Sequence, residues 1–185
     1  MYELSLFQNY NKVFTKSGIL YLFDQLNSHL KARNVKSEIC LVGDAVMCLC
    51  SDSRQSTLDL DVVFKPNQVV YDCAKAVAYE NDLNDDWLNN VVKEFLNTKS
   101  NFIEFRKFSN LTVKVASPDY MFALKLKSCR TDRKSDVDDL KFLVNLLRIR
   151  SLSDAEEIVK EFYSLKLIPN KSWYFLEELL EDENI

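Results

Sequence analysis

Hydrophobic positions change period along the chain, and these changes predict where helices and strands lie. Residues 17–33 repeat apolar side chains every three to four positions, which indicates a helix with one buried face. Residues 38–42 form a short apolar run ending at Gly43, which is typical of a buried strand that leads into a turn. The chain is therefore predicted to begin with a helix, a strand and a tight turn.

The most strand-like segment covers residues 58–64, where apolar and acidic positions alternate. Leu60 and Val62 alternate with Asp59 and Asp61. Because side chains of a strand point to opposite faces in turn, both aspartates are expected on one face.

Seven further helices and one hairpin are predicted. Helices are expected over 44–50, from Pro66 to about Tyr79, over 85–97, from Ser117 to about Arg130, and over 136–149, 154–166 and 171–182. Strands 101–108 and 111–116 are expected to form a hairpin with Ser109-Asn110 at its turn. Ser117 is expected to cap its helix, and Ser153 with Glu156 fits a capping box.

The order of these elements predicts an α+β fold. Strands occupy the first two thirds of the chain, and helices alone follow residue 117. We expect a small mixed sheet flanked by helices over 1–116, with a helical part over 117–185 packed on it. A single domain containing both parts fits the pattern equally.

Composition excludes several classes of protein. The 185 residues include 24 basic and 28 acidic side chains, a net charge of −4, which disfavours broad duplex DNA binding. Two glycines are too few for a glycine-rich phosphate loop. Neither a signal peptide nor a membrane-spanning run is evident, so a cytoplasmic protein is expected.

Histidine and cysteine usage argues against nucleophilic catalysis and zinc binding. His29 is the single histidine, so neither a Ser-His-Asp triad nor a Cys-His pair is expected. The five cysteines form no CxxC pair and are interpreted as reduced, with those near 40 and 47–50 in the core.

Asp59 and Asp61 are the strongest candidates for chemistry. Two carboxylates on one strand face repel each other unless a proton or a cation relieves the repulsion. Mg²⁺ binds through one or two carboxylates and leaves positions for phosphate oxygens. The apolar run after Asp61 indicates a buried central strand, although a solvated edge strand would explain the two acids without a metal.

Three other features are candidates for the same site, and each has a purely structural alternative. Gly43-Asp44 lies between a strand and a helix, where backbone amides can meet phosphate or simply form a turn. Lys125 lies in an apolar helix and either reaches an anion or extends to solvent. Asp136 and Asp139 share a helix face, where acids also suit the positive end of a helix.

Taken in order, these residues resemble bacterial nucleotidyltransferase-like proteins related to the AbiEii abortive-infection toxins, including relatives defined only as a domain of unknown function. The resemblance covers about residues 38–150. It rests on Gly43, Arg54, Thr57, Asp59, Asp61, Trp87-Leu88-Asn89, Ser117-Pro118-Asp119, Lys125, Arg130, Asp136 and Asp139.

The resemblance implies a polymerase-β-like core and assigns roles to these residues. Asp59 and Asp61 would hold Mg²⁺, with one of them, Asp61 foremost, taking the proton of the attacking hydroxyl. The remaining assignments place Gly43, Asp44, Arg54, Thr57, Lys125 and Arg130 around the NTP phosphates and Asp136 at the catalytic centre, with Glu104 and Asp139 as weaker candidates. The reaction would transfer a nucleotidyl group to a hydroxyl of RNA (a tRNA end) or protein, in a toxin–antitoxin or phage-defence system.

Two departures from the family pattern keep other functions open. The family turn reads Gly-Gly or Gly-Ser, whereas Asp44 would bring a negative charge toward the triphosphate. A third carboxylate is expected from a later strand, and Glu104 is the obvious one. A catalytically degenerate relative that acts as a binding or regulatory partner, such as the partner of a cognate antitoxin, is the first alternative, and a helical interaction protein is the second.

Overall fold

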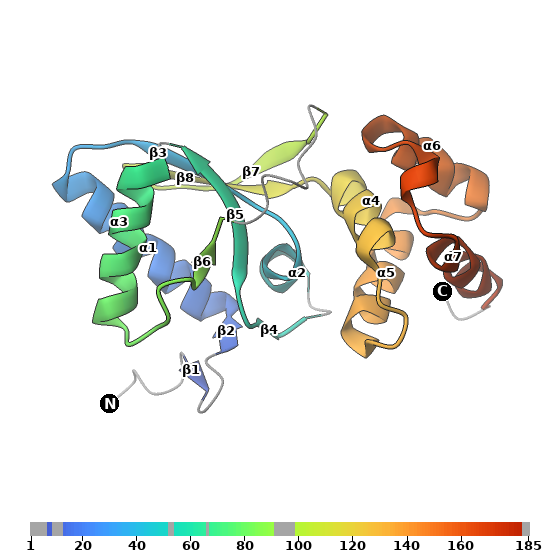
Figure 1. Ribbon diagram of the computed structural model, residues 1–185, viewed down its shortest axis with the longest axis horizontal. Helices are drawn as coiled ribbons and strands as arrows, with labels where there is room; N and C mark the ends of the chain where they lie inside the picture. The colour runs from blue at the N-terminus through green and yellow to red at the C-terminus, as the bar shows by residue number, and fades with distance from the viewer. Residues whose placement is uncertain (1–6, 9–12, 52–53, 66, 91–98, 183–185) are drawn as a thin grey trace. The chain divides into compact units, whose positions relative to one another are not determined.

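The computed structural model describes residues 7–8, 13–51, 54–65, 67–90 and 99–182 and has an α+β fold, as the sequence predicts (Figure 1). Two compact units divide the chain. The first comprises the described residues up to 90 together with Phe102–Val115. The second comprises residues 99–101 and the described chain from Ala116 onward. No helix in these ranges is both long and apolar enough to span a membrane.

The first unit contains a five-stranded mixed sheet and a small three-stranded one. The strands of the larger sheet, in spatial order, are β6 (Leu88–Asn89), β5 (Leu60–Lys65), β3 (Ser37–Leu41), β8 (Leu111–Ala116) and β7 (Phe102–Lys107). Those of the smaller sheet are β1 (Phe7–Gln8), β2 (Val13–Thr15) and β4 (Ser56–Thr57). β3 is antiparallel to β5 and parallel to β8, and β5 is parallel to β6.

Three helices complete the first unit, close to the predicted boundaries. They are α1 (Lys16–Ala32), α2 (Asp44–Cys50) and α3 (Asn67–Glu80), and α1 packs against α3. Thr15 caps α1, because its hydroxyl oxygen accepts a hydrogen bond from the Gly18 amide at 3.3 Å. Apolar side chains at helical spacing, such as Leu22 and Leu26, are fully buried.

The helix predicted over 85–97 is wrong in its described part. Asp85 and Asp86 lie in a turn, and residues 88–89 form strand β6, while 91–98 lie outside the described residues. Trp87 explains the difference, because its buried indole donates to the Ala74 oxygen on α3 at 2.9 Å. Its backbone oxygen also accepts from the Leu60 amide at 3.2 Å. These tertiary contacts override a helical pattern that has little local support.

The second unit is helical and consists of α4 (Pro118–Ser128), α5 (Lys134–Leu147), α6 (Leu152–Phe162), the 3₁₀ helix η3 (Leu165–Leu167) and α7 (Asn170–Glu181). α4 packs against α5, α6 and α7. The buried ring of Tyr120 lies 5.0 Å from that of Phe162. α4 is therefore the central helix of this unit.

Two predicted helix caps differ from the structure. The capping box of α6 is formed by Ser151 and Asp154, not by Ser153 and Glu156. Ser117 occupies the N-cap position of α4, but its hydroxyl makes no capping hydrogen bond. The sequence around α6 contains two overlapping Ser-x-x-acid patterns, and the structure uses the earlier one.

Candidate functional site

Gly43 and Asp61 lie against each other where β3 turns into α2. The antiparallel register pairs Leu41 with Val62, and the Val42 amide donates to the Asp61 backbone oxygen at 3.0 Å. Gly43 has φ +69° and ψ −145°, a conformation that other residues rarely adopt. A Cβ atom added to it would lie 3.3 Å from Asp61 Oδ2. Glycine therefore lets the backbone of the turn approach this carboxylate.

Asn89 holds the other oxygen of the Asp61 carboxylate. Parallel pairing of β5 and β6 sets Asn89 opposite Asp61, and its side-chain amide donates to Asp61 Oδ1 at 3.2 Å. Sequence analysis did not select Asn89 as a site residue. The Trp87-Leu88-Asn89 segment was the available signal, but its interpretation as helix hid the strand pairing that brings the amide to the carboxylate.

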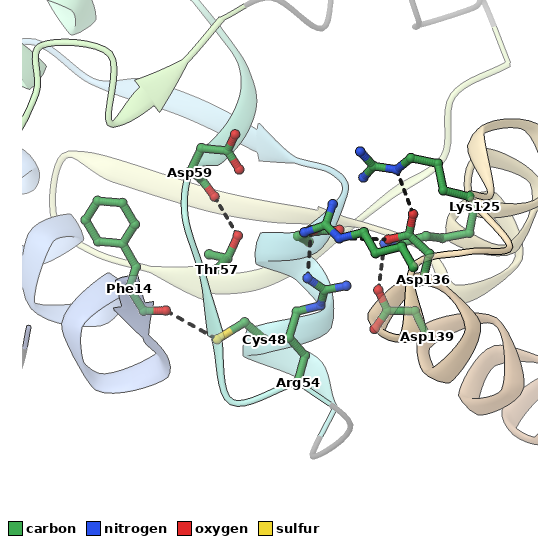
Figure 2. A network of polar contacts seen from close by, with 11 residues as sticks. Phe14, Cys48, Arg54, Thr57, Asp59, Lys125, Asp136 and Asp139 are labelled. Carbon is green, nitrogen blue, oxygen red and sulfur yellow. Dashed lines mark hydrogen bonds and ion pairs between the residues drawn. The ribbon is translucent and has the colours of Figure 1, made fainter. Parts of the chain in front are cut away.

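Asp59 lies one residue before β5. The prediction that the two aspartates share one face of a regular strand is therefore wrong. Its side chain is exposed, whereas Asp61 is half-buried. The buried hydroxyl of Thr57 donates to the Asp59 backbone oxygen at 3.0 Å, as Figure 2 shows. Thr57 therefore shapes the turn that presents Asp59 at the start of the strand.

Asp44 and Arg54 form an ion pair beside the Gly43 turn. Arg54 Nη1 lies 2.7 Å from Asp44 Oδ2, and the Arg54 side chain is 8% exposed. The guanidinium offsets the charge that Asp44 brings to the turn. The negative charge that the sequence placed near a triphosphate is thus paired within the protein.

Glu104 is not close to Asp61. It is exposed on β7, the last strand of the sheet order, and β8 and β3 separate that strand from β5. Three strand spacings correspond to about 14 Å. Glu104 therefore does not complete a carboxylate site on β5. The sequence does not reveal that the hairpin joins the sheet on the far side of β3.

In the second unit, Lys125 and Asp139 form a buried ion pair between α4 and α5. Lys125 Nζ lies 2.6 Å from Asp139 Oδ2, and the two side chains are 7% and 1% exposed (Figure 2). Such a pair needs its two charges together, because each alone would be costly in a low dielectric. Lys125 is thus buried and has an anionic partner within its own unit.

Asp136 is also paired within the second unit. Arg130 Nε lies 3.0 Å from Asp136 Oδ2, and Arg133 Nε lies 4.0 Å from its Oδ1. Asp136 is buried while both arginines remain partly open to solvent. The predicted phosphate contacts of Lys125 and Arg130 stay predictions.

The corner beside Gly43 offers one half-buried carboxylate, Asp61, and an exposed one, Asp59, just before the strand. Asp59 and Asp61 supply two carboxylates in the first unit, and Mg²⁺ in phosphate-transferring sites binds through one or two. Within the described part of that unit, no cluster of three acidic, histidine or cysteine side chains suited to a metal includes either aspartate. Asn89 occupies the neighbouring strand position instead.

Comparison with known proteins found no match. No family model, curated protein or solved structure matches this chain.

Proposed function

We propose that this chain is a Mg²⁺-dependent nucleotidyltransferase that acts on an NTP. The approach of the Gly43 backbone to Asp61 carries the proposal, because nucleotidyl transfer needs a phosphate-accessible backbone turn beside a metal-binding carboxylate. A Cβ at position 43 would lie 3.3 Å from Asp61 Oδ2, so glycine leaves this corner open. The resemblance along residues 38–150 supplies the reaction class.

Asp59 and Asp61 would hold the cation. Asn89 orients Asp61 by donating to Oδ1, while exposed Asp59 is open to approach from solvent. When bound, Mg²⁺ supplies charge neutralisation and orientation of the reacting phosphoryl group. The residues of the chain thus provide a held carboxylate and an accessible one.

The proposed reaction joins an acceptor hydroxyl to the α-phosphorus of the NTP. A P–O bond to the acceptor forms, the bond to the β-phosphate breaks, and pyrophosphate leaves. One aspartate takes the proton of the hydroxyl. Exposed Asp59 suits this role better than Asp61, whose Oδ1 accepts from Asn89 and whose Oδ2 faces Gly43. The acceptor would be an RNA end or a protein hydroxyl.

A catalytically degenerate relative is the second candidate, and Asn89 favours it. An amide stands beside Asp61 where a third carboxylate would strengthen metal binding. The Asp44–Arg54 pair also places a carboxylate in the turn. A protein of this kind would keep the fold and act through a binding partner.

Isothermal titration of each NTP, with Mg²⁺ or with EDTA, tests the proposal. Wild type, Asp59→Asn and Asp24→Asn are compared, because both aspartates are exposed and only Asp59 lies at the site. We expect Mg²⁺-dependent binding of at least one NTP that Asp59→Asn weakens at least tenfold and Asp24→Asn retains. Transfer of a labelled nucleotide to RNA or protein then identifies the acceptor.

Two results of the titration would contradict the proposal. Absence of binding to every NTP, or equal binding in EDTA, would contradict it and favour the degenerate relative. Thermal unfolding gives an independent readout, because a ligand at 100 times its dissociation constant adds about 2.7 kcal/mol to the free energy of unfolding.

A further inference from the structure

A pocket of about 590 Å³ lies in the first unit, beside the start of α1 and the far end of α2. This volume falls within the range of small-ligand sites. Its walls combine two cationic side chains with hydroxyl groups and a thiol, from Thr15, Lys16, Ser17, Cys48, Ser51 and Arg54. Leu20 adds an apolar surface. The pocket is therefore chemically suited to an anion with an organic part.

The charges of Lys16 and Arg54 both affect the Cys48 thiol in the pocket wall. Burial raises the pKa of the Cys48 thiol, while the positive charges of Arg54 and Lys16 oppose that rise. Cys48 Sγ lies 3.7 Å from the Phe14 backbone oxygen, to which it donates, so the thiol is held in place (Figure 2). Because Arg54 is paired with Asp44, Lys16 supplies the net positive charge of this wall.

Lys16 and Arg54 differ in how their charges are used. Arg54 is buried and paired with Asp44, and a guanidinium has five N–H donors with which to serve more than one acceptor. Lys16 is exposed and forms no ion pair with the side chains that the structure describes. The charge of Lys16 is thus available to a ligand without breaking a contact of the fold.

We propose that this pocket binds a phosphate monoester, with Lys16 and Arg54 on the phosphate and Leu20 against the organic group. A phosphate monoester carries about −1.5 to −2 charges at neutral pH and three terminal oxygens. Two cations and the one hydroxyl proton that the Thr15–Ser17 hydrogen bond leaves over suit the three oxygens of a phosphate better than the two of a carboxylate. Inorganic phosphate alone would leave most of the volume unfilled.

The site is distinct from the Gly43–Asp61 site and needs no divalent cation. Its binding can therefore be tested in EDTA, where nucleotidyltransfer is silent. Phenyl phosphate is the probe, and amide shifts in ¹H–¹⁵N spectra locate it. We expect saturable shifts at Lys16, Ser17, Leu20 and Gln55, weaker binding of inorganic phosphate, and affinity that falls as salt rises.

Matched variants decide the outcome. Lys16→Gln should weaken phenyl phosphate binding at least tenfold, while Lys16→Arg retains it and Asp61→Asn leaves it unchanged. Lys16 is exposed, so the substitution spares the core, and thermal unfolding checks this. Absence of saturable shifts, shifts centred on Gly43 and Asp61, or equal affinity in Lys16→Gln would overturn the proposal.

Discussion

Asn89 donates its side-chain amide to Asp61 Oδ1 at 3.2 Å across a pair of parallel strands. The contact holds a half-buried carboxylate without adding charge. The opposite side of the same carboxylate faces Gly43. Asp61 is thus fixed by an amide on one side and by a close backbone turn on the other, which makes both neighbours informative to substitute.

Asn89→Asp should convert this contact into a repulsion. Like charges at paired strand positions are unfavourable, so we expect unfolding in EDTA at pH 7 to need about 1 kcal/mol less free energy. Mg²⁺ should restore stability more in this variant than in wild type, because two carboxylates then share one cation. Thermal unfolding with and without Mg²⁺ measures the effect, and Asn89→Ala controls for loss of the hydrogen bond alone. An unchanged response to Mg²⁺ would argue against a cation beside Asp61.

Gly43→Ala should destabilise the first unit. Its positive φ strains any other residue, and the new Cβ meets Asp61 Oδ2, so we expect a loss of about 1–3 kcal/mol in urea unfolding. Asp82 provides the matched control, since it has φ 53° in the same unit. Asp82→Gly should be neutral or slightly stabilising, because glycine adopts a positive φ without the steric cost that aspartate carries. Equal stability of Gly43→Ala and wild type would show that the turn tolerates a side chain.

Lys125→Met alone should lower the free energy of unfolding far more than Lys125→Met combined with Asp139→Leu. The single change removes the ammonium group that lies 2.6 Å from the buried Asp139 carboxylate, at a cost of about 3–5 kcal/mol. The double variant Lys125→Met/Asp139→Leu should recover most of this loss, because apolar side chains of similar size need no counter-charge. Urea unfolding of both singles and the double gives the coupling free energy.

The exposed pair of Lys160 with Glu156 is the control for the buried one. Its atoms lie 3.0 Å apart with both side chains open to solvent. Lys160→Ala should change the free energy of unfolding by less than about 1 kcal/mol. Additive losses in the Lys125 and Asp139 variants would contradict a buried, mutually dependent pair.

Cys40 should alkylate slowly, and Glu38 should control its rate. Burial raises the pKa of the Cys40 thiol to about 11, and the negative charge of Glu38 adds to the rise. At pH 8 the thiol is therefore almost fully protonated, and its reactivity should climb as pH approaches 11. Glu38→Gln should lower this pKa and speed iodoacetamide labelling severalfold, as followed by peptide mass spectrometry.

Lys114 acts on the pKa of the Cys40 thiol in the opposite direction to Glu38. Its charge lowers the pKa of Cys40, so Lys114→Gln should slow labelling. Equal rates in both variants would show that access, not charge, limits the reaction.

The burial of the cysteines differs in part from the prediction that those near 40 and 47–50 lie in the core. Cys40 is half-buried and Cys50 is exposed, whereas Cys48 is buried as predicted.

Local pattern was sufficient for most elements of this protein. Amphipathic spacing predicts α1 within one residue at each end, and the Gly43 boundary predicts α2 over 44–50. The hairpin of β7 and β8 follows from two apolar strands joined at Ser109-Asn110. These features depend on side-chain periodicity and turn chemistry, which act over a few neighbouring residues.

The surroundings of the candidate site depended on contacts between distant segments. Asn89 meets Asp61 because Trp87 anchors to α3 and draws residues 88–89 into the sheet, 28 positions from the carboxylate. Glu104 falls away from Asp61 because strand order places β7 at the other end. The sequence by itself determined which residues carry charge and where the glycine turn lies. Tertiary structure decided which of them meet, because strand pairing and ion-pair partners are chosen by packing across the whole unit and leave no local pattern.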